Sequence, residues 1–169
     1  VCGNKGIGKN FFITKIIEDC INIRINKDKI NHHLTLLNNN THPNIKILHK
    51  KIDDKTGKLK NNITIDQVRE LNNFFVETSV FENFPKFIII DCADDLNLSS
   101  SNALLKILEE NKINNYFFLI SHHPYSLLPT IKSRCLRLNL SSHNFNDFEN
   151  ILASNKHSYD DEILKLLFD

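Results

Sequence analysis

The order of apolar and polar positions along the chain predicts strands separated by helices. Residues 87–90 and 116–120 are unbroken apolar runs, which suit strands that are buried on both faces of a parallel sheet. Apolar and polar residues alternate over 45–48, and residues 136–140 form a further apolar-rich run, so two more strands are predicted there. Strands that alternate with helices are typical of an α/β fold with helices on the faces of its sheet.

Apolar residues at helical spacing predict three helices between these strands. One follows the glycine-rich residues 3–10, and another covers residues 64–78. Thr64 and Gln67 have the spacing of a capping box, in which each side chain bonds the other residue's backbone N–H. The third helix is predicted over residues 102–110, after three consecutive serines whose hydroxyls suit a helix N-cap.

Residues 87–110 join an apolar strand, an acid, a turn and a helix. The strand ends at Asp91, and parallel sheets bind ligands outside the carboxyl ends of their strands. This stretch is therefore half of a βα nucleotide-binding unit.

Residues 3–10 read GNKGIGKN and match the P-loop pattern G-x-x-x-x-G-K-[ST] except at the last position. The glycines are Gly3, Gly6 and Gly8. They let backbone amides turn toward phosphate oxygens, and Lys9 would reach the outer phosphates. Asn10 stands where a Ser or Thr hydroxyl ligates Mg²⁺, and a neutral amide oxygen is a poorer ligand for that ion. The alternative is a glycine-rich turn that never meets phosphate.

The composition is that of a soluble globular protein. A net charge of +1 over 169 residues argues against a strongly electropositive DNA-binding surface. No apolar segment approaches the ~20 residues of a membrane span, and no signal peptide is expected. The four cysteines lack C-x-x-C spacing, so reduced thiols in the cytoplasm are expected. The chain starts at Val1 and contains no Met, which indicates a fragment.

Two polar segments have less pattern. His32 and His33 are adjacent and cannot face one ligand from a helix, which favours a surface segment over a metal site. Residues 50–62 are rich in lysine. Such a loop could touch nucleic acid, but a solvated hairpin or linker is the commoner outcome.

Five segments together resemble the delta-prime subunits of bacterial DNA polymerase III clamp loaders, a family within the AAA+ superfamily. The segments are THPN at 41–44, ITIDQVREL at 63–71, IIIDCADDLN at 88–97, NALLKILEE at 102–110 and LLPTIKSRC at 127–135. They follow the order and spacing of the family over most of the chain, and NALLKILEE together with SRC is quite specific to clamp-loader subunits.

The resemblance implies a RecA-like AAA+ P-loop core over residues 1–140, with a parallel sheet flanked by helices. Residues 141–169 would begin a small helical lid domain, with helices over 145–153 and 160–168. A collar domain for oligomerisation would lie beyond the end of this chain.

The resemblance also implies a subunit that does not hydrolyse ATP. In hydrolysing relatives the apolar strand ends in Asp-Glu, whereas here the pair is Asp91-Cys92, and a thiol cannot replace the carboxylate base. Binding of ATP with Mg²⁺ is expected to be weak, and Ser121 takes the position of a polar sensor. In this family the arginine of Ser-Arg-Cys, here Arg134, is an arginine finger supplied in trans to the neighbouring ATPase subunit.

The implied function is in DNA replication, where the complex loads the sliding clamp onto primed DNA. The implied partners are the ATPase motor subunit and the delta subunit, with the clamp and DNA reached through the complex and no membrane. The DNA polymerase III holoenzyme is a nucleotidyltransferase, but this subunit would neither polymerise nor hydrolyse. The family often carries a four-cysteine zinc module, and no cysteines lie between Cys20 and His42 to build one, so no zinc is expected.

Two alternatives stay open. The first is an active ATPase, such as a motor subunit, in which Asn10 and a shifted acid such as Asp94 support slow turnover. The second is a P-loop-derived interaction module unrelated to replication, against which the NALLKILEE and SRC matches weigh.

Overall fold

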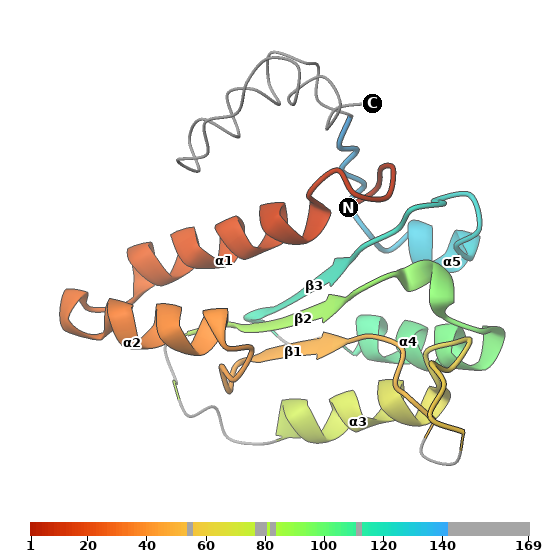
Figure 1. Ribbon diagram of the computed structural model, residues 1–169, viewed down its shortest axis with the longest axis horizontal. Helices are drawn as coiled ribbons and strands as arrows, with labels where there is room; N and C mark the ends of the chain where they lie inside the picture. The colour runs from red at the N-terminus through yellow and green to blue at the C-terminus, as the bar shows by residue number, and fades with distance from the viewer. Residues whose placement is uncertain (54–55, 77–80, 82–83, 111–112, 142–169) are drawn as a thin grey trace.

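A computed structural model describes residues 1–53, 56–76, 81, 84–110 and 113–141 of the chain (Figure 1). The lid expected over residues 141–169, including its helices at 145–153 and 160–168, lies outside this range except for residue 141.

Helices separate the strands along the described chain, as the apolar pattern predicts, but the helix over residues 27–38 was not predicted. The elements are α1 (Lys9–Arg24), α2 (Lys27–Asn38), β1 (Ile45–Leu48), α3 (Ile65–Val76), β2 (Lys86–Ile90), the short 3₁₀ helix η1 (Ala93–Asp95), α4 (Leu98–Glu109), β3 (Asn115–Leu119) and α5 (Pro129–Lys132).

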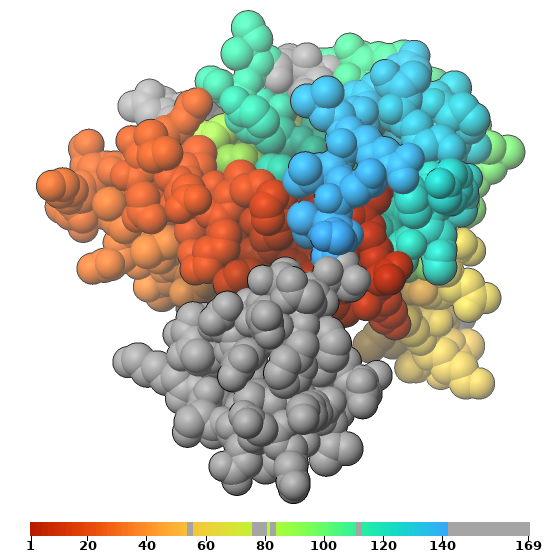
Figure 2. Space-filling view, turned by 90° about the horizontal axis from the view of Figure 1, so that it is seen from above, coloured from red at the N-terminus to blue at the C-terminus, as the bar shows by residue number. Residues whose placement is uncertain are grey.

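The sheet is parallel, with the order β1-β2-β3. Cys2 extends it beyond β3, because this residue bridges Ser121 on one side and Asn139 on the other, both in parallel. Figure 2 shows the end of the described chain (blue) packed beside its first residues (red). The strand expected over 136–140 is thus reduced to a single bridge. The segment before the glycine-rich loop therefore occupies an inner position of the sheet, next to β3.

Helices cover both faces of the sheet (Figure 1). α1 and α2 lie on one face, and α3 and α4 lie on the other. Phe87 and Ile89 of β2 belong to the apolar cluster under α1 and α2, whereas Ile88 and Ile90 belong to the cluster with α3 and α4. The unbroken apolar run of β2 is explained by this burial on both sides.

α4 begins earlier than its apolar spacing predicts. It starts at Leu98, and its N-cap is Asn97, whose side-chain oxygen accepts a hydrogen bond from the Ser100 backbone N–H at 2.9 Å. The three serines lie inside the first turn instead of capping it. The prediction of a helix from residue 102 was therefore wrong by four residues, because an exposed Leu98 offers no apolar periodicity.

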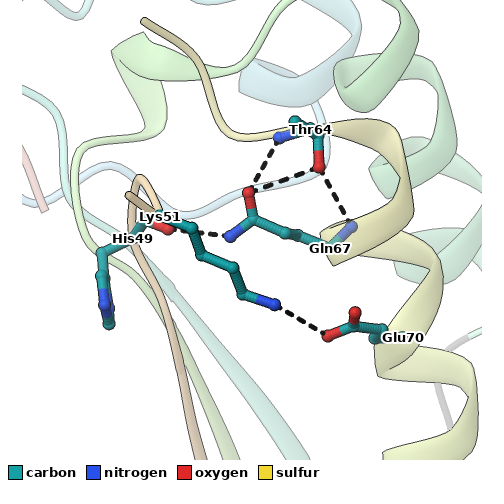
Figure 3. Close-up of polar contacts among 5 residues, drawn as sticks. All are labelled: His49, Lys51, Thr64, Gln67 and Glu70. Atoms are coloured by element: carbon teal, nitrogen blue, oxygen red, sulfur yellow. Dashed lines mark hydrogen bonds and ion pairs between the residues drawn. The ribbon is translucent and has the colours of Figure 1, made fainter. Parts of the chain in front are cut away.

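The capping box of α3 is confirmed (Figure 3). The Thr64 backbone N–H donates to Gln67 Oε1 at 3.2 Å, and the Gln67 backbone N–H donates to Thr64 Oγ1 at 3.4 Å. Gln67 also donates from Nε2 to the His49 carbonyl at 2.9 Å, which ties α3 to the chain after β1. Beside it, Lys51 and Glu70 form an exposed ion pair at 3.5 Å.

Replacing Gln67 with Ala should lower the free energy of unfolding by ~1–2 kcal/mol, because it removes a cap and leaves two partly buried backbone groups without that partner. Glu70→Ala, one helical turn away, is the control and should cost ~0–1 kcal/mol, since its ion pair is exposed. Urea unfolding measures both values. Equal losses in the two variants would contradict the structural role given to Gln67.

The expectation of a surface segment around His32 and His33 was wrong for His33. This residue lies in α2 and is 1% exposed, and its Nδ1 is 2.9 Å from Nε2 of the equally buried His42. His42 Nδ1 accepts a hydrogen bond from the Asn44 backbone N–H, so the proton of neutral His42 is on Nε2 and is donated to His33. The rings of Phe81 and Phe84 pack around the pair.

Acid should destabilise this part of the fold. Burial, helped by the neighbouring His33 and His32, lowers the pKa of His42 from 6.5 to about 4. The unfolded chain therefore binds a proton between these pH values and the folded chain does not. The free energy of unfolding should fall as the pH drops from 6.5 to 4, by up to about 3 kcal/mol.

Urea unfolding across this pH range tests the expectation. A His42→Gln variant should show a shallower pH dependence, whatever its absolute stability, while His123→Gln, with an exposed side chain, should keep the dependence of the parent. An unchanged pH dependence in His42→Gln would exclude this histidine as its source.

Candidate functional site

The glycine-rich loop joins the Cys2 bridge to α1, as its motif predicts. Gly8 is the N-cap of α1 with φ 84°, a conformation that disfavours residues with a Cβ. At Gly3 a Cβ would come within 2.5 Å of the Leu140 carbonyl oxygen, so the close approach of these two segments also requires glycine. The first turn of α1 contains no acidic residue, so its N-terminal end remains suited to an anion.

The Lys9 side chain folds back and bonds backbone carbonyls of this loop. Its ammonium donates to the carbonyls of Gly3 at 2.8 Å and Asn4 at 2.6 Å, and the residue is 4% exposed. Burial lowers the pKa of Lys9, and the Asp94 carboxylate opposes this shift. An ammonium has three N–H donors, so one remains for a phosphate oxygen.

Asn10 and Asp91 lie in direct contact at the carboxyl end of β2. Asn10 Nδ2 donates to Asp91 Oδ1 at 3.3 Å. The structure therefore brings together two residues that the sequence assigned to one nucleotide site. An amide N–H occupies the side of Asp91 that faces α1, so a Mg²⁺ ion between these residues would have to displace this hydrogen bond.

Cys92 cannot act as a base in its present surroundings. Burial is the main cause that raises the pKa of its thiol to about 11, and the nearby Asp95 and Asp94 carboxylates act in the same direction. The thiol is therefore protonated near neutral pH. Its backbone also adopts φ 66°, an uncommon conformation for a residue other than glycine.

Asp94 serves as an anchor for the loop between β3 and α5. Its oxygens accept hydrogen bonds from Ser121 Oγ at 2.7 Å, the His122 N–H at 2.6 Å, the His123 N–H at 3.3 Å and Ser126 Oγ at 3.1 Å. Burial acts to raise the pKa of Asp94, but these hydrogen bonds together lower it below its usual value. Asp94 also accepts a weaker hydrogen bond from Cys92 Sγ at 3.8 Å. A carboxylate that accepts so many hydrogen bonds is a weak base, which disfavours Asp94 as the acid that orients water.

Ser121 is fully buried and tied to the same anchor. Its hydroxyl donates to Asp94, and its carbonyl accepts a hydrogen bond from the Gly3 N–H at 3.3 Å. Ser121 therefore lies next to the glycine-rich loop, and its role as a sensor stays a prediction. The sequence missed the role of Asp94, because nothing in its spacing pairs it with residues about 30 positions later.

Arg134 lies on the surface after α5. Its Nη2 donates to Glu109 Oε1 at 2.5 Å and its Nη1 donates to the Thr130 carbonyl at 3.0 Å. The side chain is 38% exposed. These bonds go to residues other than the predicted nucleotide-site residues, and they reveal Glu109 as a partner that the sequence did not indicate.

Asp94→Asn should lower the free energy of unfolding by ~1–3 kcal/mol, since an amide N–H would face backbone donors that now bond a carboxylate oxygen. Asp95→Asn is the matched control. Asp95 makes one ion pair with Lys50 at 3.1 Å, and its neutralisation should cost ~0–1 kcal/mol. Chemical unfolding compares the two. A smaller loss in Asp94→Asn than in Asp95→Asn would rule out the anchor.

The parallel sheet, the glycine-rich loop before α1 and Asp91 at the end of β2 define an α/β core of the AAA+ P-loop type. The model of the family described as "DNA polymerase III, delta subunit" matches residues 1–144, and the chain belongs to this family.

Individual relatives agree with this assignment. The chain is 40% identical over 102 residues to the DNA polymerase III subunit delta' of Pseudomonas aeruginosa. This match covers 60% of this chain and 29% of that protein. It is 36% identical over 110 residues to the DNA polymerase III subunit delta' of Haemophilus influenzae. This match covers 65% of this chain and 31% of that protein. It is also 38% identical over 74 residues to replication factor C subunit 3 of Schizosaccharomyces pombe. This match covers 43% of this chain and 22% of that protein. The chain thus spans under a third of the length of these relatives.

A solved structure supports the fold. The chain superimposes with a TM-score of 0.53 on a DNA polymerase III gamma subunit-related protein from Thermotoga maritima, at 17% identity. The match covers 83% of this chain and 49% of the other.

Proposed function

We propose that this chain is part of a clamp-loader subunit that does not hydrolyse ATP and that supplies Arg134 in trans to the nucleotide of a neighbouring ATPase subunit. Its partners would be that motor subunit and the delta subunit. The sliding clamp and primed DNA would be reached through the complex, in the cytoplasm.

The absence of hydrolysis is supported by two independent replacements at one site. Phosphoryl transfer depends on positioning and charge stabilisation, through a metal ion and a residue that orients the nucleophile. Asn10 stands at the position of the metal-binding hydroxyl and donates to Asp91 instead. Cys92 stands at the position of the acid and keeps its proton. The nucleotide site would be degenerate, with weak binding of ATP and Mg²⁺ and no required cofactor.

The observation that carries the proposal is the surface position of Arg134. Its guanidinium is partly exposed, and its bonds in the described part of the chain go to Glu109 and Thr130 and not to the glycine-rich loop. A planar fork of N–H donors suits phosphate oxygens on another molecule. An arginine finger is worth ~10³–10⁵ in rate in other phosphoryl-transfer systems.

An active ATPase is the alternative function. It needs an acid to replace Cys92, and Asp94 is the nearest candidate. The hydrogen bonds that Asp94 accepts from Ser121, Ser126, Cys92 and two backbone N–H groups count against this role. Among the described residues no group of three or more His, Cys, Asp or Glu side chains could hold a metal ion, and the absence of zinc stays a prediction. No described helix is long and apolar enough to cross a membrane.

Arg134→Ala in the complete clamp-loader complex should reduce DNA-stimulated ATP hydrolysis at the neighbouring site by ~10³-fold or more, because it removes the charge that stabilises the transition state. The measurement is single-turnover hydrolysis of ATP in the assembled complex.

Arg137→Ala is the matched control, since Arg137 is an exposed arginine three residues away that bonds Asn139 of its own chain. It should leave hydrolysis unchanged. Equal rates in the Arg134→Ala and parent complexes would refute the assignment of the arginine finger. Rapid hydrolysis of Mg-ATP by the subunit on its own would refute the non-hydrolysing role.

A further inference from the structure

We propose that Glu109 is a positioning residue that acts as the resting counter-ion of Arg134, and that the polyphosphate of the neighbouring subunit replaces Glu109 when the interface closes. This inference rests on the proposed function of Arg134. It adds that two anions bind the Arg134 guanidinium in turn. Glu109 binds it first, and the polyphosphate of the neighbouring subunit then takes its place.

Two elements of the same subunit hold the guanidinium. Glu109 is the last residue of α4, and Thr130 belongs to α5. The Glu109 carboxylate accepts from Nη2 and the Thr130 carbonyl accepts from Nη1. Within the described part of the chain, Glu109 is the carboxylate that forms an ion pair with Arg134. The Glu109 contact lies at the C-terminal end of α4, where a cation is favoured.

The contacts engage the terminal nitrogens that phosphate recognition uses. A guanidinium has five N–H donors, and bidentate binding of a phosphate or carboxylate uses two of them on one edge of the fork. One N–H of Nη1 and one N–H of Nη2 bond Thr130 and Glu109, so three of the five donors remain. A phosphate on these remaining donors would lie beside the Glu109 carboxylate, and because two anions repel each other, its binding disfavours the Glu109 contact.

The ion pair between Glu109 and Arg134 is weak enough for a phosphate to replace it. The Glu109 side chain is 51% exposed and that of Arg134 is 38% exposed, so water and salt weaken their attraction. Exposed ion pairs of this kind change an equilibrium by a factor of about 5 or less. A triphosphate carries more negative charge than one carboxylate, so it displaces Glu109 once it comes within reach.

Glu109→Gln tests the exchange in the complete complex. The amide has the size of the carboxylate but no charge, so Arg134 is released more easily. The ATP concentration that gives half-maximal DNA-stimulated hydrolysis should fall ~2- to 5-fold, with little change in the maximal rate. The difference from the parent should shrink as salt is raised, because the ion pair is screened.

Glu110→Gln is the matched control, since Glu110 is the adjacent residue, is exposed, and loses the same charge. It should leave the half-saturating concentration unchanged. In an Arg134→Ala background, Glu109→Gln should have no effect, because the group through which it acts is gone. Thermal unfolding of each variant checks that the fold is intact, and Glu109→Ala provides a second variant.

Each other outcome has a definite meaning. A higher half-saturating concentration or a lower maximal rate in Glu109→Gln would overturn the exchange, since Glu109 would then assist Arg134. An equal shift in Glu110→Gln would reduce the effect to net charge and would also overturn it. If Arg134→Ala impairs hydrolysis while Glu109→Gln matches the parent, this inference fails and the proposed function stands. If Arg134→Ala has no effect, the proposed function fails first.

Discussion

Burial of β2 on both faces is the constraint on which the rest of the structure depends. Phe87 and Ile89 pack beneath α1 and α2, while Ile88 and Ile90 pack against α3 and α4. Each large apolar side chain contributes ~1.5–3 kcal/mol when it is fully buried. β1 and β3 pair with this strand on either side. The strand therefore joins both helical layers and fixes the point at which Asp91 leaves the sheet.

The same constraint explains how the scaffold of a nucleotide site is retained while its reactive groups differ. Asp91 stays at the end of β2 because the strand position is set by the core. Lys9 and Asp94 use their charges inside the domain, closing the glycine-rich loop and anchoring the segment after β3. Cys92 is a partly buried thiol that keeps its proton. In our proposal the charge that acts on another molecule is that of Arg134, which bonds Glu109 and Thr130 in the structure.

Local patterns allowed much of the fold to be predicted, and long-range partners account for what was missed. The apolar runs of β2 and β3 and the Thr64 capping box depend on residues close in sequence. The burial of His33 depends on His42 across a turn, and no local signal indicates it. The contact of Arg134 with Glu109 joins residues 25 positions apart, so the SRC segment identified the arginine but not its partner.

The most direct test of the account is a structure of the complete complex with a non-hydrolysable ATP analogue on the motor subunit. The account predicts that the guanidinium of Arg134 lies within about 3 Å of a γ-phosphate oxygen of the neighbouring subunit and has left Glu109. A closed interface in which Arg134 still bonds Glu109 and Thr130, with another residue on that phosphate, would contradict it.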